Sequence, residues 1–90
     1  MSAYFVYVLQ CRDESLYTGI TTDVSRRFET HKRGAGGNYT RSRGVVKMLY
    51  AEKQKNRSCA QKREAEIKSW TRQKKIQLIH SKDDARFGSR

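Results

Sequence analysis

The run YFVYVLQC at residues 4–11 limits the folds open to this chain more than any other feature. Aromatic and β-branched residues dominate the run, and these residue types favour a strand. Alternate positions would point to opposite sides, with Phe5 and Leu9 on one side and Val6 and Val8 on the other. Because both sides are apolar, the sequence predicts a central strand that is buried on both faces.

The other elements are predicted from turns, glycines and helical spacing. Gly19 in the second strand allows another group to approach its backbone closely. Val24, Phe28 and His31 fall at i, i+4 and i+7, which is one face of a helix. Ser58, with a glutamine three residues later, forms a capping box for a further helix. After the first strand, we predict a turn at 12–15, a strand over 16–20 and a helix from 22–23 to 33–34. A mobile loop over 34–44 leads into a strand over 45–51. A helix from 58 and a short helix over 72–79 complete the order.

The order β-β-α-β-α-α predicts an α+β fold, with helices packed on a small sheet that is at least partly antiparallel. A chain of 90 residues is long enough for one domain with a small core. We assign residues 1–80 to this domain and residues 81–90 to a polar C-terminal tail.

The charge balance is the first indication of a partner. The chain has 20 Lys and Arg against 9 Asp and Glu, a formal net charge of +11. Self-repulsion on this scale favours association with a polyanion. Nucleic acid is the leading interpretation, an anionic membrane surface is the second, and a merely basic protein is the third.

Two further observations concern the compartment. No apolar run approaches the roughly 18–20 residues that cross a bilayer, and the first residues lack the basic region of a secretory signal. Cys11 and Cys59 fit neither a zinc spacing nor a disulfide framework. We therefore expect a protein of the reducing cytoplasm that does not enter a membrane.

Much of the positive charge lies in two segments. Residues 53–75 hold nine basic and two acidic residues, and the predicted loop over 34–44 adds more. We expect these cations to bind the phosphate backbone of a nucleic acid. The candidates are Arg41, Arg43, Lys62, Arg63, Lys68, Arg72, Lys74 and Lys75.

Four polar side chains fall at positions that a purely apolar core would not use. Tyr7 and Tyr17 lie on the first two predicted strands, either as core tyrosines with satisfied hydroxyls or as a chemical pair. Arg27 lies on the apolar stripe of its helix, where it either meets an anion or extends along the rim. Glu64 lies on the inward stripe of the later helix, where its partner is either a basic side chain or a metal ion.

These residues occur in an order that resembles the GIY-YIG nuclease superfamily. Phe5-Val6-Tyr7, followed after nine residues by Tyr17-Thr18-Gly19, is similar to its paired signature. The stretch over 20–31 looks like its arginine-bearing helix, with Arg27 and His31 at the expected places. Arg63-Glu64 with Ile67-Lys68 is similar to its glutamate helix. The resemblance covers residues 3–79 and is closest to small, stand-alone bacterial members.

The resemblance implies a three-stranded antiparallel sheet flanked by helices, and Mg²⁺- or Mn²⁺-dependent cleavage of DNA, with a place in repair or recombination. Tyr7 and Tyr17 would lie beside the scissile phosphate, one of them activating the attacking water. Arg27 would stabilise the phosphate in the transition state. Glu64 would be the single protein ligand of the metal ion, in keeping with the preference of Mg²⁺ for few carboxylates and several waters.

Two departures from the family pattern matter. Phe5 stands where the family has glycine. Many active members also have an asparagine beyond the glutamate helix, and this chain has none after Glu64. His31, or a residue of the predicted loop, would then have to serve in its place.

The second departure leaves an alternative open, a nucleic-acid-binding module that keeps the fold and the basic face without turnover. A third interpretation is a subunit whose targeting is supplied by a protein partner. The oligomeric state stays open.

The two-tyrosine arrangement makes a geometric prediction. Directly opposed residues of an antiparallel pair have a constant index sum. A four-residue loop over 12–15 gives a sum of 27 and places the two tyrosines on opposite faces of the sheet. An odd loop gives a sum of 26, which pairs Tyr7 with Gly19 and Leu9 with Tyr17. We predict the odd loop, or a bulge.

Overall fold

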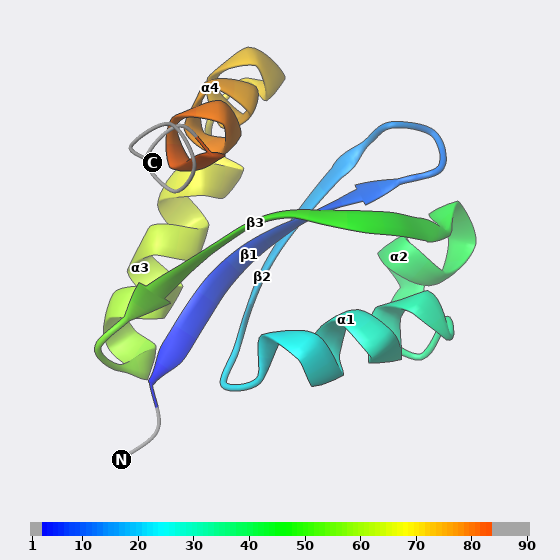
Figure 1. Ribbon diagram of the computed structural model, residues 1–90, viewed down its shortest axis with the longest axis horizontal. Coiled ribbons are helices and arrows are strands. Elements are labelled where there is room, and N and C mark those ends of the chain that lie inside the picture. Colours follow the sequence, from blue (N-terminus) through cyan, green and yellow to red (C-terminus); the bar gives the residue numbers. More distant parts are fainter. Residues whose placement is uncertain (1–2, 84–90) are drawn as a thin grey trace.

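The computed structural model describes residues 3–83, and within them three strands form one antiparallel sheet. The strands are β1 (Tyr4–Cys11), β2 (Leu16–Thr21) and β3 (Val45–Gln54), in the order β2-β1-β3. The apolar run therefore forms the central strand, as predicted (Figure 1). Val6, Val8 and Leu9 are fully buried because the strand is covered on both faces.

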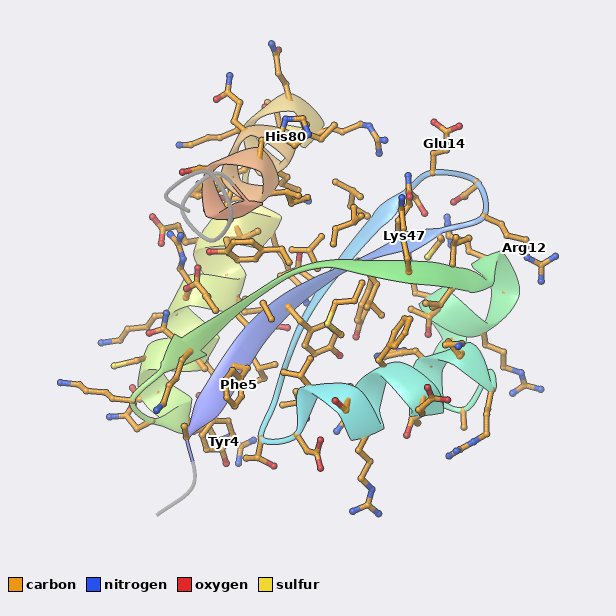
Figure 2. The ribbon with its side chains drawn as sticks, viewed as in Figure 1. Tyr4, Phe5, Arg12, Glu14, Lys47 and His80 are labelled. Atoms are coloured by element: carbon orange, nitrogen blue, oxygen red, sulfur yellow. The ribbon has the colours of Figure 1, made fainter. Side chains whose placement is uncertain are left out.

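The β1–β2 hairpin has the odd register that the sequence predicts. Tyr7 pairs with Gly19 and Leu9 with Tyr17. The turn holds three residues and is closed by the Cys11 amide, which donates to the Ser15 carbonyl at 2.9 Å. Glu14, at the tip of the hairpin in Figure 2, takes a φ of 68°. A left-handed third residue is the usual way to close a three-residue hairpin.

The four helices of the described chain form two groups (Figure 1). They are α1 (Val24–Lys32), α2 (Asn38–Arg43), α3 (Arg57–Lys68) and α4 (Arg72–Asp83). The helices α3 and α4 lie on one side of the sheet, and α1 with α2 lies on the other. Each face of β1 is thereby covered by its own helix pair.

Two aspects of the predicted helices were wrong. The helix α3 begins at Arg57, and its cap is Asn56, whose side chain accepts from the Cys59 amide at 2.8 Å. The predicted capping box at Ser58 is therefore displaced by a residue that caps equally well. The helix α4 continues to Asp83, so the first three residues of the predicted tail are helical. The rest of that tail lies outside the described residues.

The segment over 34–44 was also predicted wrongly as a mobile loop. It contains α2, which begins after Gly37 and ends at Gly44, both with positive φ. A helix of six residues is too short to show a hydrophobic period. Thr40, in the middle of α2, is 1 % exposed, which ties this segment to the interior.

The core on the α3–α4 side consists of two adjoining clusters. Val6 packs with Ala60 and Ile67, and Val8 packs with Tyr50 and Ile79. Fully burying a valine or isoleucine side chain contributes about 1.5–3 kcal/mol, so these contacts fix α3 and α4 on the sheet. The odd-numbered residues of β1 point to the opposite face, and that face carries the candidate site.

Candidate active site

Tyr7 and Tyr17 come together on the α1 face of the sheet. Their ring centroids are 6.3 Å apart, and Tyr7 is only 1 % exposed. The hydroxyl of Tyr7 lies over the backbone of Gly19, where an added Cβ would be 2.5 Å from the hydroxyl oxygen. Gly19 therefore has no side chain because the Tyr7 ring occupies that space, which agrees with the prediction from its sequence position.

His31 extends this pair from α1. Its imidazole is 1 % exposed, and its Nε2 lies 2.9 Å from the Tyr7 hydroxyl oxygen. The Tyr17 ring packs edge-on against the imidazole, with centroids 5.2 Å apart. On its other side, His31 Nδ1 lies 2.8 Å from the Thr40 hydroxyl oxygen. The imidazole is therefore held at both nitrogens and along one edge.

Burial is the largest influence on the pKa of both groups, and it favours the neutral form of each. Burial, and then the nearby Tyr17, raise the pKa of the Tyr7 hydroxyl, as does the charge of Glu64, whereas Arg27 lowers it. Burial, and then the charge of Arg27, lower the pKa of the His31 imidazole. Arg27 and Glu64 therefore act electrostatically on Tyr7 from two different helices.

Arg27 takes the second of the two positions that the sequence left open, at the rim of its helix. Its side chain is exposed, and with Arg26 it lines a cavity of about 330 Å³ whose other walls are Thr21, Thr22, Asp23 and Thr30. A long side chain on an apolar stripe can turn outward and keep its guanidinium in water. Both arginines therefore line one polar hollow at the start of α1.

Glu64 lies on α3, with its side chain 23 % exposed, and forms an ion pair with Lys68 at 3.1 Å. A basic side chain is one of the two partners that the sequence predicts for Glu64. The Lys68 side chain is 52 % exposed, and ion pairs of this kind contribute only about 0–1 kcal/mol. Exchanging Lys68 for another cation would therefore cost little.

The described residues contain no cluster of side chains that could hold a metal ion without other ligands. In residues 3–83 there is no group of three or more His, Cys, Asp or Glu side chains that could hold a metal ion. A site that uses Glu64 would consequently complete its ligands with waters and substrate oxygens, which is the usual habit of Mg²⁺.

The predicted phosphate-binding cations divide into exposed and engaged groups. Arg63 donates to Glu52 at 2.9 Å and to Glu66 at 3.0 Å, and lies over the Trp70 ring. These partners make it a structural residue of α3, and its hydrogen bonds to the carboxylates raise its pKa against the effect of burial. The exposed members of the set are Arg41, Arg43, Lys62, Lys68, Arg72 and Lys74, and Lys75 is half-buried.

Several of the exposed cations also have contacts. Arg43 pairs with Asp13 at 3.2 Å and lies 4.0 Å from the Tyr39 ring centroid. Lys74 lies over the Trp70 ring, and Arg72 donates to the Glu14 carbonyl. Within residues 3–83, Arg41 and Lys62 are therefore the exposed candidates that form no ion pair and no contact with an aromatic ring.

Sequence reasoning missed Thr40 and Tyr39. Thr40 contacts His31 from α2, and the Tyr39 ring lies 5.7 Å from the Tyr17 ring. Both follow two glycines in a segment with no helical period, so composition indicated a loop. No local signal relates a threonine to a histidine nine positions earlier.

Comparison with known proteins identifies relatives along most of the chain. A family model described as the GIY-YIG catalytic domain matches residues 3–77. A UPF0213 protein of Clostridium perfringens is 51 % identical over 78 residues, covering 87 % of this chain and 84 % of its own. A UPF0213 protein of Staphylococcus aureus is 51 % identical over 79 residues, covering 88 % and 96 %.

Two solved structures resemble this fold. The solution structure of a UPF0213 protein from Bacillus halodurans is 41 % identical, with a TM-score of 0.58, and covers 89 % of this chain and 85 % of its own. The solution structure of a protein from E. faecalis is 40 % identical, with a TM-score of 0.61, and covers 90 % and 86 %. The three-stranded antiparallel sheet with its helices agrees with the predicted α+β class.

Proposed function

The chain belongs to the GIY-YIG catalytic-domain family, and we propose that it is a metal-dependent endonuclease that hydrolyses phosphodiester bonds in DNA. The family implies nuclease-type activity, and the finer statement depends mainly on one contact. This contact is the hydrogen bond between the Tyr7 hydroxyl and His31 Nε2, formed where the charges of Arg27 and Glu64 both act on Tyr7.

The proton path begins at Tyr7. As the reaction proceeds, the Oη–H bond of Tyr7 breaks and an Nε2–H bond of His31 forms. The phenolate then takes a proton from a water molecule, whose oxygen attacks phosphorus. Because the raised pKa of Tyr7 makes this phenolate costly, His31 as acceptor and Arg27 as a nearby cation lower the barrier.

The phosphate is activated by charge. Arg27 would place a guanidinium against the phosphate oxygens as negative charge grows on them. Electrostatic stabilisation of this kind is usually the largest single contribution to catalysis. The bond from phosphorus to the leaving oxygen breaks, and that oxygen takes a proton from bulk water. His31 then loses its proton to solvent and returns to the neutral state.

Glu64 would hold the Mg²⁺ or Mn²⁺ ion. When bound, such an ion acts as a Lewis acid that neutralises phosphate charge and stabilises the leaving oxygen. Glu64 would exchange Lys68 for the ion, and the same carboxylate raises the proton affinity of Tyr7 when the ion is absent.

The substrate class follows from the surrounding charge. Exposed Arg41 and Lys62 offer contacts to phosphate that carry no base specificity. A nuclease that binds backbone in this way fits branched or damaged DNA, and therefore repair or recombination.

No helix in residues 3–83 is long and apolar enough to cross a membrane.

A cleavage assay tests the proposal. Linear, nicked, flapped and four-way DNAs are incubated with the full chain while Mg²⁺ is titrated and then removed with a chelator. We expect cleavage that rises with Mg²⁺ and stops on chelation. Glu64→Gln should lower the rate by at least about 100-fold while DNA binding persists. Glu66→Gln, on the same helix but paired with Arg63, is the matched control and should cut like the wild type.

Two results would contradict the proposal. Cleavage that survives chelation would show that the reaction needs no metal ion. A Glu64→Gln variant as active as the wild type would show that Glu64 is not a required ligand. A wild-type chain that binds every DNA with a steep salt dependence but cuts none would instead support the non-catalytic binding module.

A further inference from the structure

We propose that Thr40 is a positioning residue that holds His31 in the one tautomer able to accept the proton of Tyr7. This role rests on the proposed function, and the hydrogen-bond arrangement behind it can be tested without DNA. The Thr40 hydroxyl contacts the imidazole of His31, so it would act on Tyr7 through that imidazole.

The direction of the hydrogen bonds follows from the tyrosine. At 3.5 Å from the Gly37 carbonyl, the Thr40 hydroxyl makes too long a contact to settle where its own proton lies. The buried Tyr7 hydroxyl contacts His31 Nε2 and needs an acceptor for its proton, so it donates there, and a neutral imidazole then carries its proton on Nδ1, 2.8 Å from the Thr40 oxygen. A neutral imidazole has only one N–H, so Nε2 is left with a free lone pair.

The other end of the imidazole completes the chain. The Tyr7 hydroxyl lies 2.9 Å from Nε2 and carries a proton, since burial disfavours its anion. Tyr7 therefore donates to His31 and His31 donates to Thr40, whose hydroxyl lies 3.5 Å from the Gly37 carbonyl. All three side chains are about 1 % exposed in the free protein, so these contacts form largely out of reach of bulk water.

The segment that carries Thr40 is shaped to fit this contact. A Cβ at Gly36 would lie 2.1 Å from His31 Nδ1, so only glycine permits the imidazole to approach this part of the backbone. Gly37 supplies the terminal acceptor and has a φ of 142°, which favours glycine. Gly36 and Thr40 thus both lie against Nδ1, and the Gly37 carbonyl lies next to the Thr40 hydroxyl.

The alternative tautomer would block the proposed reaction. With the proton on Nε2, His31 would donate to Tyr7 and could not take its proton. Replacing the Thr40 hydroxyl by a methyl group keeps the shape of the side chain but removes the acceptor for Nδ1–H. The Nε2–H tautomer should then become populated. Valine makes that change, whereas serine retains the oxygen.

The experiment is nitrogen-15 NMR of the histidine side chains in the free protein above pH 7, with wild type, Thr40→Ser and Thr40→Val compared. His31 is assigned from His31→Gln, which leaves the signals of His80. We expect the Nδ1–H tautomer in wild type and Thr40→Ser, and a substantial Nε2–H population in Thr40→Val. In single-turnover cleavage, Thr40→Val should lose on the order of 10- to 100-fold in rate with little change in DNA affinity, and Thr40→Ser should restore most of the rate.

The outcomes separate this inference from the proposed function. An Nε2–H tautomer in the wild type overturns the inference, and that result needs no variant to fold. A folded Thr40→Val that keeps the wild-type tautomer and rate overturns it as well. If no variant and no wild-type chain cuts DNA while the tautomers behave as expected, the proposed function fails and the positioning of His31 by Thr40 stands.

Discussion

Tyr7 and His31 share one buried hydrogen bond, and each is kept uncharged by its surroundings. Burial raises the pKa of Tyr7 and lowers that of His31, so the resting pair holds its proton on the phenol. The same burial that makes this proton costly to move also excludes competing solvent. In the proposed reaction the substrate phosphate and the metal ion supply the charge that makes proton transfer favourable.

The shifted pKa of His31 predicts a pH-dependent stability. The native imidazole binds a proton less readily than the unfolded one, whose pKa is about 6.5. The unfolded state therefore takes up more protons as the pH falls below 6.5, and the stabilisation that is complete above 6.5 is progressively lost. Urea unfolding at pH 7.5 and pH 5 should show a free energy of unfolding that decreases toward low pH.

His31→Gln provides the control for this decrease. The pKa values of Asp13 and Glu52 are lowered from 3.8 and 4.5, so these carboxylates titrate below the window. The free energy of unfolding should change less between the two pH values in His31→Gln than in the wild type. An equal decrease in both proteins would show that His31 is not the group responsible.

At the scale of the elements, the β1–β2 hairpin positions the site through its register. A shift by one residue would turn Tyr17 to the α3 side and separate it from Tyr7. The three-residue turn fixes the register, and Gly19 leaves room for the Tyr7 ring. Sheet pairing, rather than the helices, thus decides that the two tyrosines meet.

Gly19→Ala should damage the site through this contact. The new Cβ would lie 2.5 Å from the Tyr7 hydroxyl oxygen and 2.7 Å from Cζ, so the ring must move and its hydrogen bond to His31 must lengthen. We expect a loss of about 1–3 kcal/mol in the free energy of unfolding and at least a 10-fold lower cleavage rate.

The matched substitution for this test is Ala51→Gly, at the residue that faces Tyr7 from the other neighbouring strand. It weakens the sheet without adding an atom against the ring, so its cleavage rate should stay near that of the wild type. If Gly19→Ala and Ala51→Gly reduce cleavage equally, the effect is one of stability and the close contact with Tyr7 has no separate role.

Much of this arrangement could be predicted from the sequence, because alternation along strands is a strong signal. Apolar residues on both sides of residues 4–11 identified the central strand, and the requirement that Tyr7 and Tyr17 share a face selected the odd hairpin register. The helix α2 was not predictable in this way, since five polar residues and one tyrosine after two glycines have the composition of a loop.

The orientation of single side chains was less accessible. Periodicity placed Arg27 on an apolar stripe, but a long flexible stem lets the guanidinium leave that stripe for solvent. The contact between His31 and Thr40 depends on how α2 folds back over α1. Contacts of this kind arise from tertiary structure and leave no local pattern.

For the whole molecule, only some of the cations behind the net charge of +11 are free to bind a partner, because others are held in ion pairs. Arg63 is held by Glu52 and Glu66, and Arg43 is held by Asp13. These pairs stabilise the packing of α3 and the position of α2 beside the hairpin. The charged groups of the candidate site, Arg27 and Glu64, come from two different helices, α1 and α3.

The central claim is that the Tyr7 hydroxyl, held against His31, takes part in the chemistry. The most direct test is single-turnover cleavage of a preformed protein–DNA complex, started by adding Mg²⁺, with Tyr7→Phe and Tyr4→Phe compared with wild type. Both substitutions remove one hydroxyl from β1, but Tyr4 packs against the Val6 cluster on the α3 side. Tyr7→Phe should lose about 10²- to 10⁴-fold in rate and Tyr4→Phe should cut like the wild type. A Tyr7→Phe variant that cuts as fast as Tyr4→Phe would contradict the account.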